Sequence, residues 1–175
     1  MAGEDNEINE LVETLIKKGN AKAAAGESEE AKELLEQAVE LAPGSYRAWD
    51  VLGFVRWSLG DIEGAEDCNR RSLKIKPLNA YAHKGLGICL ADQGKLDDGV
   101  AELHHAMALK PLWVDPVHDL AVVLFRNERY EDALRWLREA LKMDSKLAGK
   151  LKPLIEEAEA RLSLIHISEP TRPTT

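Results

Sequence analysis

Apolar residues recur along most of the chain at the spacing of one helix face, and glycine or proline interrupts them at regular positions. Trp49, Leu52 and Gly53, for example, follow the i, i+3, i+4 spacing of a single face. Gly60 then predicts a turn, and Pro77 lies where the following helix must end. We expect helices over residues 8–25, 29–41, 46–59, 62–75, 80–93, 96–109, 115–127 and 130–143.

The interruptions repeat at one interval of 34 residues. The residues that share it are Pro43, Pro77 and Pro111, Gly26, Gly60 and Gly94, and the small residues Ala38, Ser72, Ala106 and Ala140. Small side chains let two helix backbones approach closely, so each unit is predicted to be a helical hairpin. One hairpin cannot bury its own apolar face, and neighbouring units must therefore stack.

This period, together with the W-x2-L-G pattern at Trp49, Leu52 and Gly53, resembles the tetratricopeptide repeat (TPR) family. The resemblance covers units 12–45, 46–79, 80–113 and 114–147. It implies an all-α fold, an α-solenoid of four helical hairpins in a right-handed superhelix. The units depart from the pattern at Leu15, Lys18, Ala121, Glu128 and Ser145. Terminal units are commonly atypical because one side faces solvent.

A further helix over residues 148–161 is expected to cap the last hairpin, completing a TPR domain of residues 1–161. Leu151, Leu154 and Ala158 give it one apolar face, and charged residues lie between them. Residues 162–172, "LSLIHISEPTR", resemble a translated sequencing-library adaptor. We therefore expect residues 162–175 to be a non-native tail, which leaves open whether the native chain continues beyond Arg161; a native tail is the alternative.

Charge and composition narrow the function classes. The 175-residue chain has a net charge of −8, and it lacks the clustered lysine and arginine that phosphate contacts need. The polar start "MAGEDNEINE" does not resemble a signal peptide, and no apolar run is long enough to span a bilayer. We expect a cytoplasmic protein that binds neither nucleic acid nor membrane.

No recognisable catalytic or metal motif is present, so we expect no enzyme activity, cofactor or metal. The sequence contains no glycine-rich phosphate loop, G-x-S-x-G or H-E-x-x-H. His104 and His105 are adjacent, so on a helix they point about 100° apart and do not readily share one metal. His83 lies in the packing column of Trp49. The isolated cysteines are expected to be small buried groups.

A second stripe of residues on the first helix of each unit is separate from the packing face. The candidate site consists of Asn20, Arg47, Asp50, Phe54, Trp57, Tyr81, Lys84, Ile88, His118, Val122, Phe125 and Arg126. In similar TPR proteins these columns line the concave surface where peptides bind, and aromatic and arginine anchors are typical of hot spots. The alternative is that Phe54, Trp57 and Phe125 only fill space between neighbouring helices.

These observations favour a non-catalytic scaffold that binds a protein or peptide in a concave groove. The family's carboxylate clamp for acidic chaperone tails is disfavoured, because only Asn20 matches among Ile16, Asn20, Val51, Tyr81 and Gly85. One alternative is that the chain is the TPR portion of a longer protein whose missing domain could be an enzyme. Self-association through the end helices is another.

Overall fold

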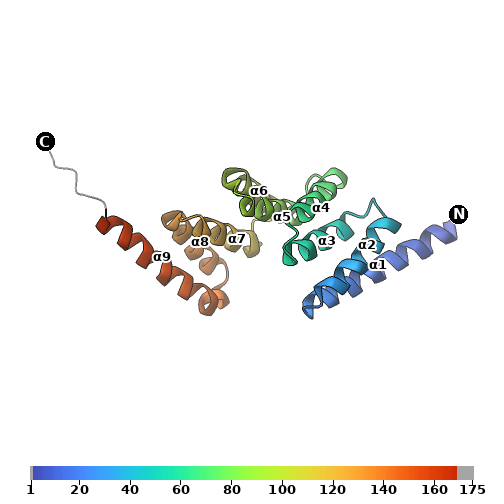
Figure 1. Cartoon of the computed structure of the whole chain (residues 1–175), viewed down its shortest axis with the longest axis horizontal. Helices are drawn as coiled ribbons and strands as arrows, with labels where there is room; N and C mark the ends of the chain where they lie inside the picture. The colour runs from blue at the N-terminus through green and yellow to red at the C-terminus, as the bar shows by residue number, and fades with distance from the viewer. Residues whose placement is uncertain (1, 169–175) are drawn as a thin grey trace. The chain divides into compact units, whose positions relative to one another are not determined.

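The computed structural model describes residues 2–168, and every regular element among them is a helix (Figure 1). The α-helices are α1 Ala2–Ala24, α2 Ser28–Leu41, α3 Tyr46–Ser58, α4 Ile62–Ile75, α5 Ala80–Asp92, α6 Leu96–Leu109, α7 Val114–Arg126, α8 Tyr130–Met143 and α9 Ala148–Ser168, with a 3-10 turn η1 over Ser145–Leu147. In this part of the chain no helix is both long and apolar enough to cross a membrane.

The eight predicted repeat helices are present and pair as four hairpins, α1 with α2 through α7 with α8. Two ends differ from the prediction. Helix α1 begins at Ala2 rather than residue 8, because the polar first residues have no apolar period from which the start of a helix could be predicted. Helix α9 continues past Arg161 to Ser168, because neither glycine nor proline interrupts residues 162–168.

The chain divides into two compact units, residues 1–109 and 110–175. In the first, the neighbouring first helices α1, α3 and α5 contact one another in sequence, and α2 and α4 each pack on the next first helix. In the second, α8 packs on both α7 and α9. The expected single domain of residues 1–161 and the right-handed superhelix stay predictions.

Each hairpin buries the columns that the 34-residue period marks out. Leu52, Leu86 and Leu120 are buried on successive first helices. Ala65 and Ala106 are fully buried on second helices, as a close-approach column requires. Gly87 and Gly99 approach each other closely, since a Cβ on either glycine would lie 2.6–2.8 Å from the other's carbonyl oxygen. Helices α5 and α6 are therefore in direct backbone contact.

A left-handed residue ends the first helix of every hairpin. Gly26, Gly60 and Gly94 have φ angles of 82°, 82° and 80°. Glu128 takes the same place in the fourth repeat, with a φ of 60° and the same closing bond from Arg129 N to the Leu124 carbonyl oxygen at 2.9 Å. The fourth repeat thus keeps the turn geometry although it lacks the glycine.

Candidate functional site

The stripe residues of the first unit lie on the neighbouring helices α1, α3 and α5, and side-chain hydrogen bonds link these helices. The guanidinium Nη1 of Arg47 on α3 donates to both carboxylate oxygens of Glu13 on α1, at 2.7 and 2.8 Å. The indole Nε1 of Trp57 on α3 donates to Asp92 Oδ2 on α5 at 2.7 Å. These pairs are 34 and 35 residues apart, about one repeat. Residues at equivalent positions of successive repeats therefore lie next to each other on neighbouring first helices.

The aromatic members of this surface differ in how much they reach solvent. Phe54 is 57% exposed and Tyr81 is 52% exposed. Trp57 is half-buried, and its ring centroid lies 6.4 Å from that of Phe54. Lys84 and Ile88 on α5 are also half-buried, whereas Asn20 at the α1 end is exposed. The surface therefore offers apolar area to a ligand at two positions on neighbouring helices.

Asp50 belongs to the predicted site, but its contacts lie within the repeat. Its half-buried carboxylate accepts hydrogen bonds from Ser72 Oγ at 2.6 Å and from Asn79 Nδ2 at 2.8 and 2.9 Å. Asn79 is the N-cap residue of α5, where its Oδ1 accepts from the Tyr81 backbone N–H. Burial raises the pKa of the Asp50 carboxyl, and the hydrogen bonds from Asn79 and Ser72 oppose this shift. The carboxylate joins α3 to α4 and α5.

The remaining predicted residues are on α7 in the second unit. His118, Val122 and Phe125 are half-buried, and Arg126 is exposed. The Phe125 ring packs edge-on against Tyr130 of α8, with centroids 5.4 Å apart, and His118 Nδ1 lies 3.3 Å from Asp119 Oδ1. A single groove that combines these four residues with those of the first unit stays a prediction.

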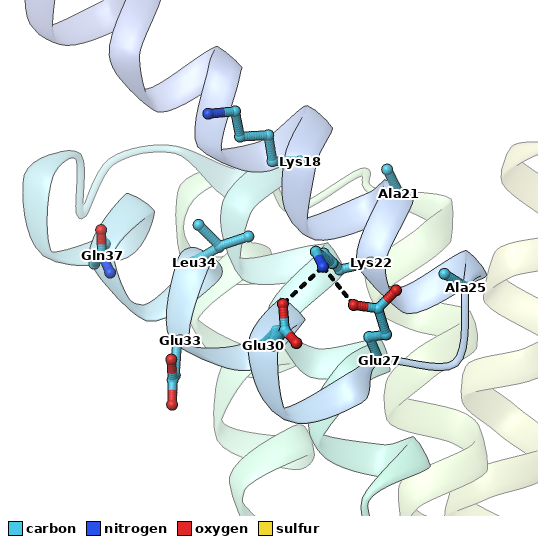
Figure 2. A pocket seen from close by; sticks show the side chains of 9 residues that line it. All are labelled: Lys18, Ala21, Lys22, Ala25, Glu27, Glu30, Glu33, Leu34 and Gln37. Atoms are coloured by element: carbon cyan, nitrogen blue, oxygen red, sulfur yellow. Dashed lines mark hydrogen bonds and ion pairs between the residues drawn. The ribbon is translucent and has the colours of Figure 1, made fainter.

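The hairpin of α1 and α2 holds a cavity of about 660 Å³ that sequence reasoning did not find (Figure 2). Lys22 lies at its edge and forms ion pairs with Glu27 and with Glu30, the latter at 2.7 Å. These pairs raise the pKa of the Lys22 ammonium and lower that of the Glu30 carboxyl. None of the predicted site residues lines this cavity.

Both cysteines are buried in the first unit. Burial raises the pKa of the Cys68 thiol to about 11 and that of the Cys89 thiol to about 12. A thiol is a nucleophile only as the thiolate, so neither sulfur is activated for catalysis. This agrees with the expectation of small, buried side chains.

Comparison with known families decides which group of proteins this chain belongs to. A sequence model described as tetratricopeptide repeat matches residues 16–80 and 55–104, and a second one with the same description matches residues 118–149. The chain belongs to the tetratricopeptide repeat family. The TPR match covers all four hairpins in part.

Curated relatives with similar TPR segments are peroxisomal targeting signal receptors of yeasts and related fungi. That of Eremothecium gossypii is 29% identical over 92 residues, which is 53% of this chain and 16% of the receptor. That of Kluyveromyces lactis is 31% identical over 77 residues, which is 44% of this chain and 14% of the receptor. The matched segment thus spans less than a fifth of either receptor.

Solved structures show the same fold at low identity. PilF of Pseudomonas aeruginosa has a TM-score of 0.69 at 20% identity, covering 95% of this chain and 80% of that one. MamA has a TM-score of 0.63 at 23% identity, covering 83% and 79%. An O-GlcNAc transferase of Thermobaculum terrenum has a TM-score of 0.67 at 24% identity, covering 75% and 26%. These likenesses establish the TPR fold alone.

Proposed function

We propose that this TPR chain is a non-catalytic scaffold that binds a protein or peptide on its first-helix surface. The observation that carries the proposal is the exposure of Phe54 and Tyr81 on the adjacent helices α3 and α5. Large aromatic side chains bury much area on contact and are frequent anchors in binding sites. The packing of the hairpins does not require either ring to be exposed.

The surroundings of these rings indicate the ligand's chemistry. Trp57 extends the apolar area beside Phe54, while Arg47 and Glu13 give the surface a paired charge at its edge. An extended peptide or amphipathic helix with apolar side chains at two positions would suit this arrangement. The related receptors are named for a targeting signal, and we propose that the ligand here is likewise a short peptide segment. Its binding in the cytoplasm stays a prediction.

Selection from a random-peptide library on the immobilised full chain tests this proposal. The affinity of each enriched peptide is then measured by fluorescence anisotropy for the wild type, Phe54→Ala and Tyr81→Ala. Truncating a hot-spot aromatic is expected to weaken binding by about 2 kcal/mol, which is roughly 30-fold. Leu78→Ala is the matched control, because Leu78 is 73% exposed but lies between α4 and α5, outside the stripe.

Two outcomes of these affinity measurements would contradict the proposal. Peptides that bind both aromatic variants as tightly as the wild type would use another surface. An equal loss in Leu78→Ala would mean that any exposed apolar residue contributes, and that the stripe is not the site.

A second candidate is that the chain is the TPR portion of a longer protein that contains an enzyme domain. The similar O-GlcNAc transferase favours it, because the aligned segment there is 26% of a longer chain with a catalytic name. Sequencing the uninterrupted gene separates the two candidates. A reading frame that continues past Arg161 into a catalytic domain supports the second, and a stop codon soon after Arg161 contradicts it.

A further inference from the structure

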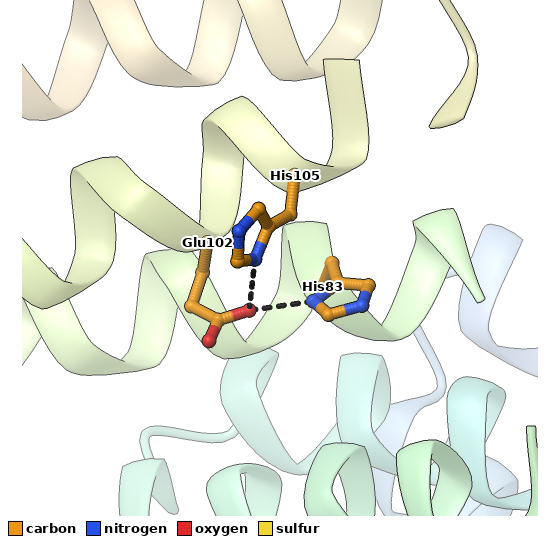
Figure 3. A group of neighbouring side chains, drawn as sticks. All are labelled: His83, Glu102 and His105. Atoms are coloured by element: carbon orange, nitrogen blue, oxygen red, sulfur yellow. Dashed lines mark hydrogen bonds and ion pairs between the residues drawn. The ribbon is translucent and has the colours of Figure 1, made fainter. Parts of the chain in front are cut away.

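Two histidines and a glutamate from paired helices converge in the third repeat (Figure 3). His83 lies in the first turn of α5, and Glu102 and His105 lie one turn apart on α6. His83 Nδ1 is 2.6 Å and His105 Nδ1 is 3.9 Å from Glu102 Oε2. One ligand atom from each residue lies within 4.8 Å of the others. The adjacent His104 is not part of the group; the second histidine of the group is His83, on helix α5.

The second nitrogen of His83 determines which atom faces the glutamate. Nε2 lies 3.0 Å from the Pro77 carbonyl oxygen, which can only accept, so Nε2 carries a hydrogen. In the neutral imidazole, the lone pair of Nδ1 is then directed at the carboxylate of Glu102. Two acceptors 2.6 Å apart repel each other unless a cation, either a proton or a metal ion, lies between them. The Nε2–H bond to a backbone carbonyl is the usual support of a metal-binding histidine.

The second repeat has the same backbone arrangement at the positions of His83 and His105, but it carries different side chains there. One repeat earlier, Trp49 Nε1 donates the matching bond to the Pro43 carbonyl oxygen at 2.8 Å. In the second repeat, the Arg71 guanidinium stacks 4.9 Å from the centre of the Trp49 ring. In the third repeat, His105 takes the place of Arg71 and packs edge-on against His83, with ring centroids 5.3 Å apart. Indole has no second nitrogen, whereas imidazole does. The third repeat keeps the geometry and adds three ligand atoms.

The close contact of α5 with α6 supports the site, and His105 opens it to solvent. Gly87 and Gly99, whose backbones are in direct contact, lie one helical turn from His83 and Glu102 respectively. The side chains of His83 and Glu102 are 15% and 23% exposed, while that of His105 is 63% exposed. A metal ion can therefore enter beside His105, and water molecules can complete the coordination of that ion.

We propose that His83, Glu102 and His105 bind a divalent transition-metal ion of the Zn²⁺ class. Two imidazole nitrogens and one carboxylate oxygen suit zinc, cobalt, nickel and copper, whereas magnesium and calcium prefer oxygen ligands alone. Ligand atoms around a tetrahedral zinc lie about 3.3 Å apart at metal–ligand distances of about 2.0–2.1 Å. The pairs at 2.6 and 3.9 Å lie on either side of that value, and all three ligand atoms lie within 4.8 Å of one another, so side-chain rotation can bring them to this spacing.

Calorimetric titration of the EDTA-treated full chain with ZnCl₂ tests the site. The wild type is expected to bind one zinc ion with the three ligands, and Co²⁺ is expected to give the visible absorption of a low-coordinate site. His105→Arg introduces the residue of the preceding repeat at an exposed position, so the fold is retained. It should weaken zinc binding by about 100-fold or more, since even outer contacts contribute 10–100-fold. Glu102→Gln should weaken it strongly as well.

His104→Arg is the matched control, because it places the same charge on the same exposed turn without touching the ligands. Its affinity should remain close to that of the wild type. The proposal is overturned if the wild type binds no zinc up to about 1 mM, a weak limit for a metal site. It is also overturned if both arginine variants lose the same affinity, or if Glu102→Gln binds as the wild type does.

Discussion

The indole Nε1 of Trp57 donates a 2.7 Å hydrogen bond to Asp92 Oδ2 and so joins α3 to α5. This gives Trp57 a structural role that the neighbouring Phe54, 57% exposed, does not share. Trp57→Ala should lower the free energy of unfolding by more than 1 kcal/mol, because it removes a half-buried ring and a hydrogen bond worth about 0.5–1.5 kcal/mol. Phe54→Ala should stay within about 0.5 kcal/mol of the wild type. Urea unfolding measures both, and the reverse order would contradict this division of roles.

The contact of α5 with α6 predicts a graded response to added methyl groups. A Cβ at Gly87 meets the Gly99 carbonyl oxygen at 2.8 Å, whereas one at Gly53 meets the Cys68 Cβ at 3.2 Å. Gly87→Ala should therefore cost about 1–3 kcal/mol through overpacking, and Gly53→Ala, one repeat earlier, should cost less. Urea unfolding followed by circular dichroism gives both values. Equal costs would show that the closer contact at Gly87 adds no strain of its own.

Glu128 has a left-handed φ of 60° where three other repeats have glycine. Replacing it with glycine should raise the free energy of unfolding by about 1 kcal/mol, because a side chain in this region costs about 1–2 kcal/mol and glycine's extra chain entropy offsets part of the gain. Glu128→Ala is the control, since alanine keeps the Cβ and should bring no such gain. Thermal melting of the three proteins tests this; a larger gain from alanine would assign the effect to charge.

The pKa of Asp50 is raised by burial in the folded chain, so its contribution to stability depends on pH. The contribution is fully present below the unfolded pKa, about 3.9, and is lost as pH rises through the higher folded pKa. The free energy of unfolding of the wild type relative to Asp50→Asn should therefore fall above about pH 4. Urea unfolding of both proteins at several pH values measures the difference. A difference that grows with pH would mean that the hydrogen bonds from Ser72 and Asn79 outweigh burial.

Residues 162–175 can be removed to test whether they belong to the fold. In the described part of this segment, Leu164, Ile165 and Ile167 are exposed although α9 runs to Ser168. Ending the chain at Arg161 should lower the free energy of unfolding by less than about 2 kcal/mol, because Leu162 is no more than half-buried and Leu164 and Ile167 are exposed. Thermal melting of the shortened chain measures this. A larger loss would contradict the expected non-native tail.

The sequence alone determined the helical hairpins, because helix periodicity and the glycine and proline stops are local properties that recur every 34 residues. It also marked Ala38 and Ala106 as buried, since a column of small residues at the repeat interval indicates helices in close contact. The end of α9 was predicted wrongly because residues 162–168 were assigned to a non-native tail, although neither glycine nor proline interrupts them.

Tertiary structure decided which members of each column meet. Asp50 and Trp57 occupy similar stripe positions, yet one is bound to Ser72 and Asn79 and the other reaches Asp92. His83 and His105 are 22 residues apart, and only the pairing of α5 with α6 brings both of them to Glu102. Such contacts depend on how closely two helices approach and on which side chains meet there. The spacing of apolar residues along the sequence describes one helix at a time, and so it cannot specify the contacts between helices.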